Sequence, residues 1–316
     1  MIRSFYIQGN ELCWEKDPSD FNNESQGKTI WIDLQEPTPD EQKWVEEYFG
    51  IEFFTPQEAA EIESSSRFFE EVNGFEANSA FVVKEGTSYT TRQVSFILKN
   101  NILFTLRHSD LKSFAETVRK LKTFTATNSK ALQIWLLLLE TQTDLDADFI
   151  EFLTRSTNKV SRKLVKERSI EEEVLIHITE LQENTILIRG SVVDKQRLVS
   201  SLLKSFLVDE PEKERLRIIL KDINSLLQHA QFSFERLEYL QNTFLGLVNI
   251  EQNQVIKIFT VVTVVFMPPT LIASIYGMNF NFMPELEWKM GYPFALLLMV
   301  ISSLGFLWYF KRKNWL

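Results

Sequence analysis

Two long apolar segments near the C-terminus constrain this sequence more than any other feature. Residues 255–275 and 292–310 are almost free of charge, and crossing a bilayer takes about 20 mostly apolar residues. The chain before them is rich in charged residues, which is typical of a water-soluble fold. We therefore expect a soluble part, a membrane helix at 251–276, a polar loop at 277–291, a second membrane helix at 292–310 and a basic tail at 311–316.

The composition limits which compartment the soluble part can occupy and which partners it can bind. The formal net charge of −9 argues against nucleic-acid binding and suits a surface that meets cations. Cys13 is the only cysteine, so an intrachain disulfide cannot form, and the first residues do not resemble the apolar core of a signal peptide. We expect the soluble part to lie in the cytoplasm.

Residues 1–125 are predicted to form an α/β domain. Thr38-Pro39-Asp40-Glu41 is a capping box with proline at the first helical position, and Gly50 is a plausible end for that helix. Thr55-Pro56-Gln57-Glu58 begins another helix in the same way. Short runs rich in β-branched and aromatic residues alternate with these helices and predict the strands of a mixed sheet, at residues 2–7, 29–34, 80–84, 94–98 and 102–107.

Residues 126–250 are predicted to form a helical stalk. Residues 131–208 predict two long helices separated near 166–169, and Pro211 suits the start of a third, long helix near 212. This helix carries a heptad seam of Leu216, Leu220, Ile223, Leu227, Ala230, Phe234 and Leu237. We favour a parallel stalk of several chains as the partner of the seam, and the alternative is a helical hairpin within one subunit.

The first membrane helix carries a polar stripe along one face. Its members recur at helical spacing and are Asn253, Thr260, Thr263, Met267, Thr270 and Ser274. Polar groups at membrane depth tend to face a bundle interior or a watery cavity, so the stripe predicts the lining of a pore. The alternative is that the hydroxyls bond back to their own helix. Pro268-Pro269 interrupts the backbone hydrogen bonds and predicts a bend.

Charges at the ends of the two apolar segments indicate their orientation. Lys257 and Lys311–Lys313 flank the segments, whereas the loop between them carries Glu285, Glu287 and Lys289. The positive-inside rule then places both termini in the cytoplasm and the loop outside. Since two helices cannot enclose a conduit alone, transport would require identical subunits as partners within the bilayer.

The loop begins with groups that suit a hydrated dication. Magnesium loses its water reluctantly, so a selective site can bind the hydrated ion through neutral acceptors. Asn279 offers an amide oxygen, and Gly277 lets a backbone carbonyl approach closely. A ring of such groups would hold the ion and still release it. The thiolate or histidine ligands that suit bare zinc or copper do not occur in this segment.

At these residues the chain resembles the CorA magnesium transporter family, and most closely its enterobacterial-type branch. Tyr276-Gly277-Met278-Asn279-Phe280 matches the family signature, and Met283-Pro284-Glu285-Leu286 matches the loop motif after it. The likeness extends over essentially the whole chain and includes residues 67–70, 249–253 and 266–270.

The resemblance implies an α+β fold with a membrane part, assembled as a homopentameric funnel in the inner membrane. The function implied is a passive Mg²⁺ channel, with Co²⁺ and Ni²⁺ as further ions, whose selectivity filter is Gly277, Met278 and Asn279. Ile256 and Met267 would be hydrophobic constrictions. The pore lining implied agrees with most of the stripe and consists of Asn253, Ile256, Thr263, Met267, Thr270 and Ser274. Mg²⁺ would be both substrate and regulatory ligand, and no cofactor is expected.

Four residues relate to the charge at the pore entrance and to regulation by cytoplasmic Mg²⁺. Asn281 stands where relatives commonly carry Glu, which removes one negative charge per subunit, whereas Glu285 remains. Glu61 sits where relatives carry a carboxylate that senses cytoplasmic Mg²⁺, and Asp222 is a candidate partner for it. For Glu61 and Asp222 the alternative is an ordinary solvated carboxylate.

Other chemistry finds little support in the sequence. The Walker-type loop that binds nucleotide phosphates is absent, and His108, His177 and His229 lack zinc-ligand spacing, so an enzyme or ATP-driven pump is not expected. Two alternatives to a magnesium channel are a zinc transporter of the same fold, against which Met278 argues, and a membrane-tethered scaffold that conducts nothing.

Overall fold

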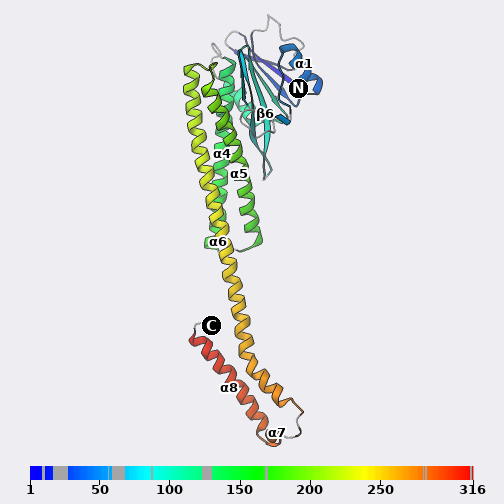
Figure 1. The fold of residues 1–316 in the computed structure, drawn as a ribbon, viewed down its shortest axis with the longest axis vertical. Helices are drawn as coiled ribbons and strands as arrows, with labels where there is room; N and C mark the ends of the chain where they lie inside the picture. Colours follow the sequence, from blue (N-terminus) through cyan, green and yellow to red (C-terminus); the bar gives the residue numbers. More distant parts are fainter. Residues whose placement is uncertain are drawn as a thin grey trace. The chain divides into compact units, whose positions relative to one another are not determined.

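The computed structural model (Figure 1) describes residues 1–8, 11–16, 28–55, 57–58, 68–86, 88–122, 130–167, 170–279, 281, 283–313 and 315. It divides into two compact units, Met1–Gln241 and Asn242–Leu316. One helix, α6 (Glu210–Tyr276), contributes its first part to one unit and its second part to the other.

The first unit is built on a seven-stranded sheet in the order β2-β1-β3-β7-β6-β5-β4. Neighbouring strands are antiparallel except for the parallel pair β3 and β7. The strands are β1 Ile2–Gln8, β2 Glu11–Lys16, β3 Lys28–Gln35, β4 Phe68–Glu71, β5 Gly74–Glu85, β6 Ser88–Lys99 and β7 Ile102–Arg107.

All five strands expected from the sequence are confirmed, while β2 and β4 were missed. These two lie at the edges of the sheet, and most of their side chains are exposed or half-buried. Edge strands therefore lack the apolar pattern that identifies a strand in a sequence. Hairpin pairing with β1 and β5 defines them instead.

The two faces of the sheet pack against different helices, because side chains alternate along each strand. On one face Ile32, Leu34 and Phe104 form a core with Val45 of α1 (Pro39–Phe49). On the other face Phe96 lies against Trp135 of a long helix, with ring centroids 5.3 Å apart. Figure 1 shows α1 on one side of the sheet and the long helices on the other.

The first predicted helix begins and ends where the sequence placed its caps. The Thr38 hydroxyl accepts a hydrogen bond from the Glu41 backbone N–H at 3.2 Å, and the Glu41 carboxylate accepts one from the Thr38 N–H at 2.8 Å. These bonds, with the N-terminal ammonium 2.9 Å away, lower the pKa of Glu41. Gly50 ends the helix with a left-handed φ of 61°. In the second predicted helix Glu58 also bonds back to Thr55, but most of that segment lies outside the described residues.

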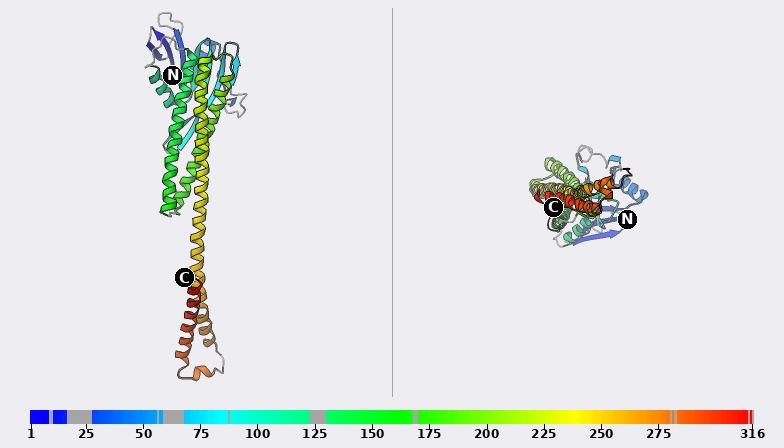
Figure 2. Two further views of the ribbon diagram at one scale, coloured as in Figure 1. Left: turned by 90° about the vertical axis from the view of Figure 1, so that its left-hand side faces the viewer. Right: turned by 90° about the horizontal axis from the view of Figure 1, so that it is seen from below.

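Three long helices run side by side in the first unit (Figures 1 and 2). They are α4 (Ala131–Lys166), α5 (Glu172–Lys204) and the first part of α6, which confirms the two helices expected over 131–208 and the long helix after them. A shorter helix, α3 (Lys112–Leu121), was not predicted and packs Phe114 against Trp31 of the sheet.

The single chain covers four of the seven residues of the heptad seam and leaves Leu220, Leu227 and Phe234 half-buried. Packing within one subunit, which we gave as the alternative, is therefore confirmed for part of the seam, and the parallel stalk of several chains stays a prediction. Leu216, Ile223 and Leu237 are at most 1% exposed within a single chain. Polar contacts from the same stretch of α6 reach α4 and α5, among them the ion pair of Arg215 with Glu140. An apolar seam is satisfied by any matching apolar surface, so the seam by itself does not require a second copy.

A buried ion pair joins these helices to the sheet. The Lys195 ammonium on α5 lies 2.9 Å from a carboxylate oxygen of Asp146 on α4, and both side chains are at most 1% exposed. Lys195 also donates to the Ser191 hydroxyl at 2.6 Å and to the Ala80 carbonyl of β5 at 3.1 Å. The Asp194 carboxylate accepts from the Ala80 N–H at 2.8 Å. Strand β5 is thereby linked to α5 and, through Lys195, to α4.

The second unit is a helical hairpin. It contains the second part of α6, a short helix α7 (Pro284–Glu287) within the connecting loop, and α8 (Gly291–Arg312). Val261 and Val265 of α6 pack on Phe310 of α8. By length and composition α6 and α8 are both suited to crossing a membrane.

We expect Lys195→Met to lower the free energy of unfolding by about 3–5 kcal/mol, because it leaves the Asp146 carboxylate buried without its counter-charge. Urea unfolding of the detergent-solubilised full chain, followed by tryptophan fluorescence, measures this. Adding Asp146→Leu should recover most of the loss. Lys43→Met, which removes an exposed partner of Glu47, is the control and should change stability by less than about 1 kcal/mol. Equal losses of unfolding free energy in Lys195→Met and Lys43→Met would contradict a special role for the buried ion pair of Lys195 with Asp146.

Candidate functional site

The predicted stripe lies on the side of α6 that faces away from α8. Successive helical residues are turned by about 100°, and Val261 and Val265 mark the side that packs on α8. On the opposite side the structure exposes every predicted lining residue of the single chain: Asn253, Ile256, Thr260, Thr263, Met267, Thr270 and Ser274. The structure thus brings these residues onto one uncovered face.

The threonine hydroxyls of the stripe bond back to their own helix. Thr260 donates to the Ile256 carbonyl at 2.8 Å, and Thr263 donates to the Phe259 carbonyl at 2.9 Å. Thr270 donates to the Phe266 carbonyl, also at 2.8 Å. This is the arrangement that we considered as the alternative to pore lining. It does not remove the hydroxyls from the exposed face, because each oxygen keeps acceptor capacity after its proton is donated.

Two apolar side chains interrupt the polar character of this face. Ile256 is 54% exposed and Met267 is 59% exposed in the single chain, similar to other apolar residues of this segment such as Phe259 and Phe266. Met267 lies immediately before Pro268-Pro269, at the interruption of the helical hydrogen bonds.

The Gly277-Met278-Asn279 tripeptide continues the last turn of α6. The Gly277 N–H donates to the Ala273 carbonyl at 2.9 Å, and the Met278 N–H donates to the Ile275 carbonyl at 3.2 Å. A Cβ on Gly277 would lie 3.1 Å from the Ala273 oxygen, which is a crowded contact. Asn279 is exposed. The C-terminal end of a helix carries a partial negative charge, so the tripeptide lies where a cation is favoured.

Residues 283–290 of the loop are folded tightly against the start of α8. A Cβ on Gly291 would collide with the Glu285 carbonyl oxygen, so any larger residue must displace the chain there. The Gly291 N–H also donates to the Trp288 carbonyl at 2.8 Å. Glu285 and Asn281 are exposed. The sequence did not predict α7, whose four residues are too few for a periodic pattern.

The two candidate sensor residues are not brought together in the part of the chain that is described. Asp222 is exposed on α6, and Glu61 lies outside the described residues. Within those residues no group of three His, Cys, Asp or Glu side chains is placed to hold a metal ion.

The acidic neighbourhood of Glu76 on β5 was not predicted from the sequence. Burial raises the pKa of Glu76, and the Glu71 carboxylate raises it further, while Lys99 lowers it. Glu52 and Glu58 add smaller contributions that raise it. The pairing of β4 with β5 brings Glu71 near Glu76, whereas Glu52 and Glu58 belong to the segment that follows α1.

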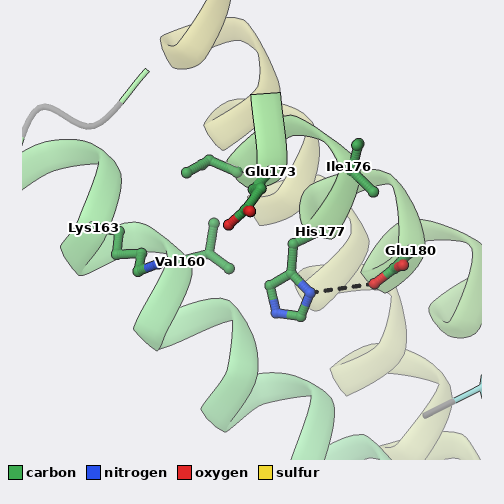
Figure 3. A pocket seen from close by; sticks show the side chains of 7 residues that line it. Val160, Lys163, Glu173, Ile176, His177 and Glu180 are labelled. Atoms are coloured by element: carbon green, nitrogen blue, oxygen red, sulfur yellow. Dashed lines mark hydrogen bonds and ion pairs between the residues drawn. The ribbon is translucent and has the colours of Figure 1, made fainter. Parts of the chain in front are cut away.

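A cavity of about 320 Å³ lies between the end of α4 and the start of α5 (Figure 3). Glu173 lines it, together with Lys163 from the other helix. The His177 ring lies 3.4 Å from the Glu180 carboxylate and is half exposed. Glu173 is itself exposed, as are Glu171 and Glu172 before it. The mixture of charges indicates a solvated surface rather than a metal centre.

Comparisons with protein families and with known proteins agree with the resemblance carried by residues 276–280. The family model described as CorA-like Mg²⁺ transporter protein matches residues 26–312. The magnesium transport protein CorA of Wolinella succinogenes is 38% identical over 297 residues, which are 92% of each chain. That of Escherichia coli K12 is 38% identical over 321 residues and covers 100% of both chains.

The fold is also that of a solved relative. The complete structure of the CorA magnesium transporter from Methanocaldococcus jannaschii matches with a TM-score of 0.84 at 21% identity, over 100% of this chain and 99% of that one. The predicted architecture of an N-terminal α/β domain, a long helix and two C-terminal apolar helices is confirmed. The resemblance at residues 276–280 extends over the whole sequence, and the chain belongs to the CorA-like Mg²⁺ transporter family.

Proposed function

We propose that this chain forms a passive Mg²⁺ channel of the inner membrane that also admits Co²⁺ and Ni²⁺. The observation that carries the proposal is the uncovered face of α6, on which a line of hydroxyls leads to Gly277-Met278-Asn279 at the end of the helix. Membership of the family and the names of the full-length relatives support Mg²⁺ as the ion.

The bonding of the hydroxyls suits a hydrated cation. Water molecules around Mg²⁺ are polarised and act as hydrogen-bond donors. Thr260, Thr263 and Thr270 donate their own protons to backbone carbonyls, so their oxygens can meet these waters only as acceptors. A face of oriented acceptors lets the ion pass without losing its water, which Mg²⁺ releases reluctantly.

The filter combines a side-chain oxygen with the field of the helix. The Asn279 amide oxygen is a neutral acceptor, and the C-terminal end of α6 adds a partial negative charge beside it. Neutral groups bind the hydrated ion weakly enough to release it. Glu285 is a further negative charge in the loop, and Asn281 contributes none.

Identical subunits would complete the conduit. The stripe is uncovered in a single chain, and two helices cannot enclose a pore, so copies of α6 would surround one axis as a homopentamer. Ile256 and Met267, which are both exposed in one chain, would then meet their counterparts as hydrophobic constrictions.

The membrane potential would drive the ion inward. With both termini in the cytoplasm, entry of a dication releases roughly 4.6 kcal/mol for each 100 mV, twice the value for a single charge. Binding of cytoplasmic Mg²⁺ would favour the closed state, with Glu61 and Asp222 as the candidate sensing carboxylates.

Asn279→Ala should abolish Mg²⁺ uptake, because it removes the acceptor at the filter. The measurement is Mg²⁺ flux into vesicles that contain the purified full-length protein, at several internal Mg²⁺ concentrations. Asn281→Ala is the matched control, since it makes the same chemical change two residues further along, and it should retain most of the flux.

Normal flux through the Asn279→Ala protein would refute the filter assignment. Zn²⁺ flux without Mg²⁺ flux in a competition assay would favour the zinc transporter of the same fold. Vesicles without any cation flux would favour a scaffold that conducts nothing.

Thr263→Val should lower the flux about tenfold, whereas Thr263→Ser should stay close to wild type because serine keeps the hydroxyl oxygen. A hydrogen bond to a charged group contributes about 1.5–3 kcal/mol, and about 1.4 kcal/mol corresponds to tenfold. Thr179→Val is the control, because Thr179 on α5 also bonds back to its own helix at 3.1 Å but lies away from the stripe. Similar results for Thr263→Val and wild type would argue against pore lining.

Gly291→Ala should disturb the loop, because the new Cβ has no room beside the Glu285 carbonyl. We expect reduced Mg²⁺ flux and faster proteolysis within residues 283–290. Gly305→Ala on α8 is the control, since a Cβ at Gly305 meets nothing within 4 Å. Identical digestion of the two variants would contradict the tight packing at Gly291.

A further inference from the structure

The double proline of α6 changes the bonding of the helix backbone. In an α-helix each carbonyl accepts from the N–H four residues later, and proline has no N–H. Pro268 therefore removes the donor for the Val264 carbonyl, and Pro269 removes the donor for the Val265 carbonyl. Within a bilayer an unsatisfied carbonyl costs several kcal/mol unless the protein supplies a partner.

A serine of the neighbouring helix supplies that partner at Val265. The Ser303 hydroxyl of α8 donates to the Val265 carbonyl at 3.3 Å. Val265 is only 7% exposed and packs with Val261 and Phe310, so the bond lies within the contact between the two helices. It links the point of interruption in α6 directly to α8.

The adjacent serine bonds differently. Ser302 donates to the Met299 carbonyl of its own helix at 2.8 Å. That bond stays inside α8 and does not reach α6. Two neighbouring hydroxyls of the same size thus offer a direct comparison between a bond within a helix and a bond between helices.

We propose that Ser303 is a positioning residue for conduction, which holds α8 to the proline interruption of α6 through the Val265 carbonyl. The proposal rests on the proposed channel function. The interruption lies between the inner stripe residues, up to Thr263, and the outer ones, from Thr270 to the filter. The bend at the prolines sets the direction of the outer half, and Ser303 limits the range of that bend.

The first test replaces each serine in the full-length protein, reconstituted in vesicles. Ser303→Val should lower the maximal Mg²⁺ flux by about threefold, the effect of a typical hydrogen bond between membrane helices. The half-saturating Mg²⁺ concentration should not change, because the filter is intact. Ser303→Thr, with the shape of valine and a hydroxyl, should restore the flux, and Ser302→Ala should match wild type.

The decisive test repeats Ser303→Val in two proline variants. Pro269→Ala returns an N–H that can donate to the Val265 carbonyl, so Ser303→Val should then have no further effect. Pro268→Ala returns a donor to Val264 instead, so the threefold loss should persist. An equal loss in both variants, or equal behaviour of Ser303→Val and Ser303→Thr, would overturn the proposal.

A measurement that does not depend on flux separates this inference from the proposed function. The melting midpoint of each protein in detergent, read by tryptophan fluorescence, should fall on Ser303→Val in the wild-type and Pro268→Ala proteins and not in Pro269→Ala. If wild-type vesicles conduct no Mg²⁺, the channel function and the role in conduction both fail, while this pattern of midpoints still decides the hydrogen bond between the helices.

Discussion

The backbone hydrogen-bond ladder of α6, interrupted at Pro268 and Pro269, is the constraint on which the rest of the structure depends. A backbone inside a bilayer must satisfy its polar groups internally, and a helix does so. The helix extends from Glu210 to Tyr276, so a helix that packs on α4 and α5 in the first unit also carries the stripe of the second and leads to the Gly277-Met278-Asn279 tripeptide. Its register decides which side chains share a face.

Side-chain hydroxyls modify this ladder at several points. Thr260, Thr263 and Thr270 donate to carbonyls that already belong to the ladder, which leaves their oxygens as acceptors on the uncovered face. Ser303 donates from α8 to a carbonyl that Pro269 deprives of its N–H. A side-chain hydroxyl therefore presents an acceptor oxygen along the stripe in one case and joins two helices in the other.

Much of the fold was predictable because its determinants are local. The capping box at Thr38, the break near residue 167 and the two apolar segments correspond to helix boundaries in the structure. The edge strands β2 and β4 were not predictable, since their pairing partners and not their composition define them. The heptad seam predicted burial, and the chain itself covers four of its seven residues, but a periodic apolar face does not specify which surface buries the rest.

The sequence alone determined the family, the two apolar helices, the one-sided stripe and the Gly277-Met278-Asn279 signature, all of which follow from residue identity and helical spacing. The tertiary structure decided which face of α6 the chain covers for itself and which it leaves open. It also decided that the hydroxyl of Ser303, and not that of Ser302, reaches the proline interruption. Those facts depend on how α8 packs against α6, and contacts between distant segments have no local pattern in the sequence.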